Sequence, residues 1–502
     1  MRLTGLDQYI EQVRAEWENI GVAVTVVQGS EALNVKGFGV REFGQTARID
    51  GHTRFQIGST TKAFAAAALG MLVDEAKIGW DDPVINYLPG FQLQDPALTR
   101  RLTIRDAVAH RSGISHNVYP FLGIMDLDEA VRQLRYVAAQ GAFRDSFVYS
   151  NLMYAVTAQI VEAASGCTWH EFVKCRFLQP LEMTRSGTSP LEFWDRKFVT
   201  PTYLGSAPAG QAGIDDAGDP NVAMPHGRDA CGSVAVLPWQ NYDNAAPAGS
   251  LVSSAADMAT WMIANLNAGR FEGRQLLSKE TLQELHAAQN QHVGAPPFPF
   301  EGSPMSYAMG WWRTQYRGFT CLVHSGGMIG SPAFVALLPD LKVGVTVLAN
   351  SSHPDDTLFH KSIVFRAFDC LLGAPPHDWG KEFLDRARKT QHQAQEEEER
   401  LQGSRQRNSA PSRSVEQYAG LYDDATGASG HVRLQAKNGQ LTLSFAGEGT
   451  YCASLEHWQH DVFRLRSSRT IDEVLGPQFV DFKLAASGEI KSMSAFGATF
   501  RH

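Results

Sequence analysis

The sequence has no apolar run long enough to span a membrane, which takes roughly 20 residues. Near the N-terminus, Asp7, Glu11 and Arg14 interrupt every candidate for a secretory signal. It also lacks a basic stripe and has a net charge of −8, whereas nucleic-acid binding requires clustered Lys and Arg. We therefore expect a soluble, cytoplasmic protein, unless an upstream leader is missing, with neither a membrane nor nucleic acid as partner.

The sequence also lacks the motifs that are typical of metal-binding proteins, dinucleotide-binding proteins and α/β-hydrolases. None of the 6 cysteines has Cys-x-x-Cys spacing, so we expect buried free thiols in that compartment rather than disulfides. The 16 histidines show no metal-ligand spacing, and Gly37-Phe38-Gly39 lacks the rest of a dinucleotide fingerprint. The absence of a Gly-x-Ser-x-Gly elbow disfavours an α/β-hydrolase. We expect no metal and no cofactor.

The residues that are present indicate a globular protein of two or three domains. The chain has 502 residues, 43% hydrophobic and 20% charged, which is close to an average soluble protein. Periodicity predicts an α+β domain over residues 1–380, with an antiparallel sheet flanked by helices and a helical subdomain. The expected elements are helices at 6–18, 60–73, 152–164, 256–267 and 356–372, a hairpin at 22–27 and 33–40, and a strand meander at 319–323, 333–338 and 343–348.

The last quarter of the chain has a different composition. Residues 381–413 are charged and almost free of apolar side chains, which is typical of a solvated linker, partly helical. Residues 414–502 contain short alternating runs separated by Gly and Ser turns, and these predict a small all-β barrel or sandwich. We expect this domain either to cover the rim of a cleft or to mediate homo-oligomerisation.

Ser59 is the serine that carries the clearest chemical signal. A serine hydroxyl needs a neighbouring base to become a nucleophile, and Ser59 alone among the serines has a lysine three residues later, Lys62. Residues i and i+3 share a helix face, and this helix is apolar on nearly all sides, so burial should lower the Lys62 pKa. The alternative is that Ser59 only caps the helix while Lys62 extends to water.

Two further motifs occur twice each. Tyr-x-Asn is found at Tyr149-Ser150-Asn151 and at 242–244, and the first is favoured because it directly precedes a buried helix; a structural Tyr with a capping Asn is the alternative there. His-x-Gly is found at 292–294 and at His324-Ser325-Gly326, and the second is favoured because it follows a strand and continues into Gly327. His110 and Gly113 are expected to stabilise a turn.

In this order, Ser-x-x-Lys, Tyr-x-Asn and His-x-Gly resemble the signatures of the serine β-lactamase and penicillin-binding-protein superfamily. The resemblance is closest to its class C-like branch of esterases, D-aminopeptidases and amidases, and it covers about residues 6–372. Supporting segments are LTIRDAVAHRSGI at 102–114, PAGSLVSSAADMATWM at 247–262 and the HSGG…LPD…VLAN run at 324–350. The tail beginning EQYAGLY at 416–422 looks like the lipocalin-like barrel often appended to these hydrolases.

The resemblance implies a role for each motif residue. Ser59 would form the acyl-enzyme, Lys62 would take its proton, and Tyr149 would relay a proton to the leaving group. Asn151 would hydrogen-bond the substrate flank, and His324, Ser325 and Gly326 would line the opposite strand. The N–H groups of Ser59 and Gly327 would form the oxyanion hole.

One departure from the family pattern bears on the substrate. Many β-lactamases and transpeptidases have Lys-Thr-Gly where this chain has His324-Ser325-Gly326, and histidine is mostly neutral near pH 7. We therefore expect a serine acyl hydrolase or acyl transferase of the esterase, amidase or peptidase type. Its expected substrate is a small-molecule ester or a peptide-like amide, D-configured residues included. The alternatives are a penicillin-recognising sensor that acylates without turnover, and a β-lactamase.

Overall fold

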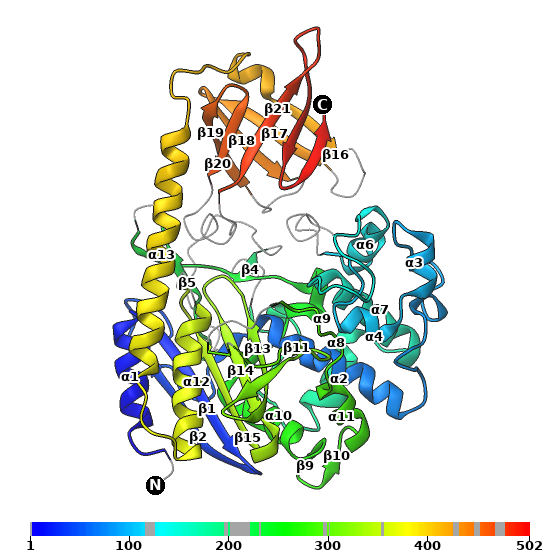
Figure 1. Ribbon diagram of the computed structural model, residues 1–502, viewed down its shortest axis with the longest axis vertical. Coiled ribbons are helices and arrows are strands. Elements are labelled where there is room, and N and C mark those ends of the chain that lie inside the picture. The colour runs from blue at the N-terminus through cyan, green and yellow to red at the C-terminus, as the bar shows by residue number, and fades with distance from the viewer. Residues whose placement is uncertain are drawn as a thin grey trace.

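The computed structural model describes residues 3–115, 126–194, 199–200, 221–229, 232–294, 299–300, 302–352, 356–424, 431–445, 452–466 and 477–502. Figure 1 shows two parts, a larger one of sheet and helices and a small barrel above it. One long helix runs beside the larger part and up to the barrel.

An antiparallel sheet forms the centre of the larger part. Its strands are β1 (Gly21–Gln28), β2 (Glu31–Gly39), β11 (Ser306–Tyr307), β12 (Trp312–Tyr316), β13 (Phe319–Gly326), β14 (Ala333–Leu338) and β15 (Val343–Ala349). Their order is β11-β12-β13-β14-β15-β1-β2. The N-terminal hairpin therefore joins the late meander, with Val24 opposite Val347.

Alternation along β1 builds two cores, one on each face of the sheet. Val22, Val24 and Val26 pack with α1 (Leu6–Glu16) and α12 (Asp356–Leu372), whereas Ala23 and Val27 pack with α2 (Thr61–Asp74) and α10 (Ala255–Leu266). The first turns of α13 (Trp379–Ser404) extend the first of these cores. Strands at the two ends of the domain thus share both cores.

The helical subdomain surrounds α2. Its helices are α3 (Pro96–Arg101), α4 (Ile104–Val108), α6 (Leu127–Arg132), α7 (Asn151–Ser165), α8 (Trp169–Val173), α9 (Ala246–Gly249) and α11 (Lys279–His286). Because α2 packs against α7, α9 and α11, residues 61–72 are all buried. A helix that is apolar on every side is stable only in such a position.

Short elements connect these layers. The short strands are β3 (Arg54–Gln56), β4 (Val199–Thr200), β5 (His226–Arg228), β6 (Val234–Val236), β7 (Trp239–Gln240), β8 (Val252–Ser254), β9 (Arg270–Phe271) and β10 (Arg274–Gln275). The short helical turns are η1 (Gly58–Thr60), η2 (Val84–Asn86), η3 (Gln133–Tyr136), η4 (Lys174–Leu178), η5 (Pro190–Glu192), η7 (Asp243–Ala245), η8 (Pro339–Leu341) and η9 (Val415–Tyr418). The pair β3–β8 matters most here, because β3 leads directly to Ser59.

The C-terminal part is a closed antiparallel barrel. Its strands are β16 (Gly420–Asp424), β17 (His431–Lys437), β18 (Gln440–Phe445), β19 (Cys452–Gln459), β20 (Val462–Arg466), β21 (Phe479–Leu484), β22 (Ile490–Ala495) and β23 (Ala498–Arg501). Each strand pairs with the next, and β16 pairs with β23, where Asp424 lies opposite Phe500. The predicted α+β fold with an appended all-β barrel is confirmed.

The segment expected to be a linker is largely helical. Helix α13 covers residues 379–404, and its first turns belong to the core, since Phe383 is 0% and Leu384 7% exposed. Beyond these turns its side chains are mostly exposed, as the charged composition indicates. The boundary drawn at residue 380 therefore falls inside one continuous helix.

The expectation of buried thiols is largely wrong. Cys321 is buried, but Cys167, Cys175 and Cys452 are exposed and Cys370 is half-buried, all as free cysteines, while Cys231 lies outside the described residues. A small side chain without a periodic apolar context carries no burial signal. In the parts of the chain that the structure describes, no helix has the length and apolar character to cross a bilayer, and no group of three or more His, Cys, Asp or Glu could hold a metal ion.

Candidate active site

Ser59 lies in a tight turn between β3 and α2. Its neighbour Gly58 has φ +49°, a left-handed conformation that glycine adopts without steric cost. A Cβ on Gly58 would lie 3.0 Å from backbone atoms of Gly326 and Gly327. The turn therefore brings the Ser59 hydroxyl to the start of α2 and beside the end of β13.

Lys62 points back at Ser59 instead of reaching water. Its Nζ lies 2.9 Å from Ser59 Oγ and donates to the carbonyl oxygen of Ala248 at 2.8 Å. The residue is 0% exposed, and this burial lowers the pKa of the amine well below its ordinary value. In its uncharged form, which burial favours, the amine can donate to Ala248 and still present its lone pair to the Ser59 proton.

Tyr149 reaches the same hydroxyl from a distant part of the chain. Its phenol shares a hydrogen bond with the Ser59 side chain, and burial raises the pKa of the phenol. Its ring centroid lies 4.8 Å from Lys62 Nζ. The phenol is therefore neutral over the ordinary pH range and able to donate a proton as well as accept one.

His110 holds the segment that carries Tyr149. Its Nδ1 accepts a hydrogen bond from the backbone N–H of Ser150 at 3.1 Å, and its carbonyl accepts one from Val148 at 3.2 Å. The His110 ring centroid lies 4.4 Å from that of Tyr149. The expected role of His110 in stabilising a turn thus extends to fixing the phenol's position.

Asn151 connects the two Tyr-x-Asn motifs. Its Nδ2 donates to the hydroxyl of Tyr242 at 2.9 Å, so the motif set aside at 242–244 lies next to the favoured one. Its Oδ1 is buried and accepts no hydrogen bond among the described residues. Asn151 therefore links the two motifs and keeps one hydrogen-bond acceptor unused among the described residues.

His324 is buried, at 1% exposure. Its Nδ1 lies 2.7 Å from the carbonyl oxygen of Ser325, which can only accept, so Nδ1 carries the proton and Nε2 accepts from the Tyr307 hydroxyl at 3.1 Å. Burial lowers the pKa of the imidazole to about 3, with a smaller contribution from Lys62. The ring is neutral near pH 7 and supplies no cation to a substrate.

The end of β13 completes the site. Gly326 is buried and Gly327 is exposed, and Ser325 between His324 and Gly326 is half-buried. Among the hydrogen bonds of the described residues, none is donated by the backbone N–H of Ser59 or Gly327. The two N–H groups lie on segments that approach each other closely at Gly58.

Of two adjacent glycines, only Gly326 should be sensitive to an added methyl group. A Cβ on Gly326 would lie 2.0 Å from the carbonyl oxygen of Ile57, whereas a Cβ on Gly327 would have nothing within 4 Å. We expect Gly326→Ala to lower the free energy of unfolding by about 3 kcal/mol and Gly327→Ala to change it by less than about 0.5 kcal/mol. Denaturant titration measures both, and equal effects would contradict this packing.

Sequence reasoning missed several residues of the site. The carbonyl of Ala248 is a main-chain group, and Tyr307 belongs to no motif, so neither gave a signal. Segment 247–262 was recognised as family-like, although no role was assigned to it. A carbonyl that receives the lysine N–H could have been sought there, directly after the second Tyr-x-Asn motif.

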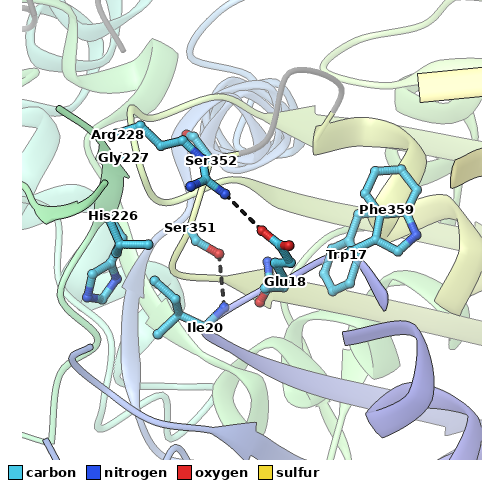
Figure 2. A pocket seen from close by; sticks show the side chains of 11 residues that line it. Trp17, Glu18, Ile20, His226, Gly227, Arg228, Ser351, Ser352 and Phe359 are labelled. Atoms are coloured by element: carbon cyan, nitrogen blue, oxygen red, sulfur yellow. Dashed lines mark hydrogen bonds and ion pairs between the residues drawn. The ribbon is translucent and has the colours of Figure 1, made fainter. Parts of the chain in front are cut away.

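A small cavity elsewhere is lined by Trp17, Glu18, Asn19, Ile20, His226, Gly227, Arg228, Val234, Ser351, Ser352 and Phe359. Figure 2 shows Arg228 and Glu18 pointing toward one another, 3.1 Å apart, and Ser351 accepting the N–H of Ile20 at 3.2 Å. It offers about 20 Å³ of space, which is room for about one water molecule. It is too small for a substrate.

Two protein-family models match this chain. The family model described as beta-lactamase matches residues 6–364. The chain belongs to the beta-lactamase family. Residues 404–501 match a second family, described as a domain of unknown function, DUF3471. The residues between the two matches, 365–403, contain the end of α12 and nearly all of α13.

Members of the beta-lactamase family are generally serine hydrolases, and one similar protein is named as a hydrolase. "Unguisins hydrolase ungD" of Aspergillus violaceofuscus is 28% identical over 392 residues, which cover 74% of this chain and 65% of the fungal protein. The chain thus spans slightly under two thirds of that relative.

Solved structures extend the similarity to the barrel. The octameric penicillin-binding protein homologue from Pyrococcus abyssi aligns over 100% of both chains with a TM-score of 0.61 and 20% identity. The D-amino acid amidase from Ochrobactrum anthropi SV3 aligns over 74% of this chain and 99% of its own, with a TM-score of 0.57 and 18% identity. At these identities the likeness establishes the shared beta-lactamase fold.

Proposed function

We propose that this beta-lactamase family member is a serine acyl hydrolase or acyl transferase that works through a Ser59 acyl-enzyme. The observation that supports this most is the position of Lys62, fully buried with its Nζ 2.9 Å from Ser59 Oγ. A charged lysine in that position would be strongly disfavoured by desolvation. Burial therefore favours the neutral amine, which is the form that can accept the Ser59 proton.

Acylation begins when Lys62 takes the Ser59 proton and Oγ attacks the acyl carbon. The N–H groups of Ser59 and Gly327 stabilise the oxyanion of the tetrahedral intermediate, and removal of one such donor typically costs about 3 kcal/mol. The bond to the leaving group then breaks. The proton on Lys62 passes through Tyr149 to the departing oxygen or nitrogen, which leaves a neutral product and the Ser59 ester.

Deacylation reverses these proton movements. Water, or an amine in a transfer reaction, gives up a proton through Tyr149 to Lys62 while it attacks the ester carbon. Collapse of the second tetrahedral intermediate returns the proton to Ser59 Oγ and releases an acid or a new amide. Hydrolysis and transfer differ only in which nucleophile reaches the ester first.

The polar groups of the site favour an ester or a peptide-like amide without an essential carboxylate. The neutral His324 replaces the lysine that offers a cation in many β-lactamases, and Asn151 Oδ1 is the proposed acceptor for a substrate N–H. The names of a similar hydrolase of unguisins and a similar D-amino acid amidase support peptide-like amides, D-configured residues included.

Covalent labelling tests the proposal. We expect one molecule of a fluorophosphonate probe to attach covalently to Ser59, visible as a single adduct in the intact mass. We also expect turnover of p-nitrophenyl esters and of D-amino-acid p-nitroanilides. Ser59→Ala should abolish both, while Ser325→Ala, which changes a serine at the end of β13, should still be labelled.

Each other outcome has a clear meaning. Labelling that survives Ser59→Ala would refute Ser59 as the nucleophile. Stable acylation by a β-lactam or an ester without turnover would favour a sensor, and efficient nitrocefin hydrolysis with no ester or amide turnover would favour a β-lactamase.

A further inference from the structure

Helix α13 begins in the larger part of the protein, the domain that contains Ser59 and is the proposed catalytic domain. The indole N–H of Trp379 donates to Asp369 Oδ2 at 2.8 Å, and Phe383 and Leu384 are buried in the core that also contains α12. A helix that starts inside a packed core has a fixed direction. The position of its far end is therefore set by the catalytic domain.

The far end of α13 is fixed to the barrel. Glu398 makes a bidentate ion pair with Arg464 of β20, with its longer N–O distance 2.9 Å, and the Arg464 side chain is 7% exposed. Just beyond the helix, Arg405 donates to the carbonyl oxygens of His457 and Trp458 and stacks 5.0 Å from the Trp458 ring. Bidentate and stacked arginines hold orientation as well as distance. The barrel is thus held by a rigid arm.

The barrel also contacts the catalytic domain directly. Its apolar core includes Ile329, which is 6% exposed, and Leu237 packs against the same cluster. In Figure 1 the barrel stands above the catalytic domain. Ile329 lies only two residues after Gly327, and two residues of chain span at most about 7 Å. An apolar contact with the barrel therefore occurs close to the proposed oxyanion hole.

The same short segment is tied to the strand that leads to Ser59. The carbonyl oxygen of Ile329 accepts from Gln240 Nε2 at 3.0 Å. Gln240 in turn exchanges two main-chain hydrogen bonds with the Gln56 side chain, at 3.0 and 2.6 Å, and Gln56 ends β3. Ile329 therefore packs against the barrel through its side chain, while its carbonyl oxygen is hydrogen-bonded to the buried Gln240.

We propose that the barrel buttresses the oxyanion hole: it docks on Ile329 and so keeps the Gly327 N–H aligned with that of Ser59. The inference rests on the proposed acyl-transfer function and assigns the barrel a part in the catalytic geometry. Ile329 is a positioning residue, because its side chain contacts the barrel and acts through Gly327. Its effect should appear in the transition state, where the oxyanion forms.

The test compares Ile329→Ala with Ile490→Ala in the full chain. Both shorten an isoleucine that packs in the barrel cluster, but Ile490 belongs to β22 of the barrel itself and not to the segment after Gly327. We expect Ile329→Ala to lower kcat about 10- to 100-fold with little change in KM, since displacement of about 1 Å costs about 100-fold. A boronic acid inhibitor, which mimics the tetrahedral intermediate, should lose affinity in parallel. Ile490→Ala should change neither.

A second pair of variants tests the proposal even if Ile329→Ala does not fold. Glu398→Gln breaks the ion pair with the barrel, whereas Glu397→Gln changes the neighbouring residue, which pairs with Arg400 on the same helix. We expect kcat to fall severalfold in the first variant only. Unchanged kcat in Ile329→Ala, or in both glutamate variants if Ile329→Ala does not fold, would overturn the proposal. Wild-type protein that is neither labelled at Ser59 nor active would instead refute the proposed function.

Discussion

Lys62→Met is expected to lower kcat/KM for a p-nitrophenyl ester by about 10²- to 10⁴-fold, the usual contribution of a general base, without loss of stability. Methionine fills a similar volume but cannot take the Ser59 proton. It also removes the cost of burying a polar amine at 0% exposure. Steady-state kinetics and denaturant titration on the same preparations measure the two effects.

The pH dependence gives an independent check on Lys62. Burial lowers its pKa well below 10.5, so kcat/KM should rise as the pH passes through the lowered value and then level off. Between that value and 10.5 the unfolded chain binds one more proton than the folded protein. Wild-type stability should therefore increase with pH over this window relative to Lys62→Met. Activity that keeps rising to pH 10.5, or a variant retaining near-native kcat/KM, would contradict the assigned base.

Tyr149→Phe should have the second largest effect, a loss of about 10²- to 10³-fold in kcat/KM. Since burial raises the pKa of this phenol, the neutral hydroxyl is the proton donor to the leaving group. The loss should be larger for a p-nitroanilide, whose anilide leaving group needs a proton, than for a p-nitrophenyl ester, whose phenolate leaves unaided. Parallel kinetics on the two substrates measure the difference.

Tyr154→Phe is the matched control. Tyr154 also packs against the His110 ring, at 5.3 Å between centroids, but its hydroxyl donates to the carbonyl of Val108 at 2.7 Å instead of contacting Ser59. We expect a loss of about 1 kcal/mol in stability and only a small change in kcat/KM. Equal losses in the two variants, or equal losses on the two substrates, would mean that Tyr149 has a packing role.

The parts of the site that could be predicted are those set by short-range rules. Ser59 and Lys62 are three residues apart, and the apolar character of the residues after Lys62 already indicated its burial. Tyr149 and His324 were found because their motifs occur in a recognisable order. For each of them the relevant information lies within a few residues of the chain.

The parts that could not be predicted depend on which distant segments meet. Nothing around Tyr307 indicates that its hydroxyl approaches His324 at 3.1 Å, and the second Tyr-x-Asn motif was set aside although Tyr242 bonds Asn151. The same holds for Ile329, whose surroundings suggest a turn after a strand and whose side chain lies in the core of another domain. Periodicity identifies a buried side chain but not its partner.

The rigidity of α13 restricts how the length of this chain can change. The helix has 26 residues, so it is about 39 Å long, and one inserted residue would rotate everything beyond it by about 100°. Seven inserted residues would nearly restore the orientation but would lift the barrel about 10 Å, out of reach of Ile329. The middle of the helix therefore accepts changes of residue type on its solvent side, while insertions and deletions there would separate the two halves of the protein.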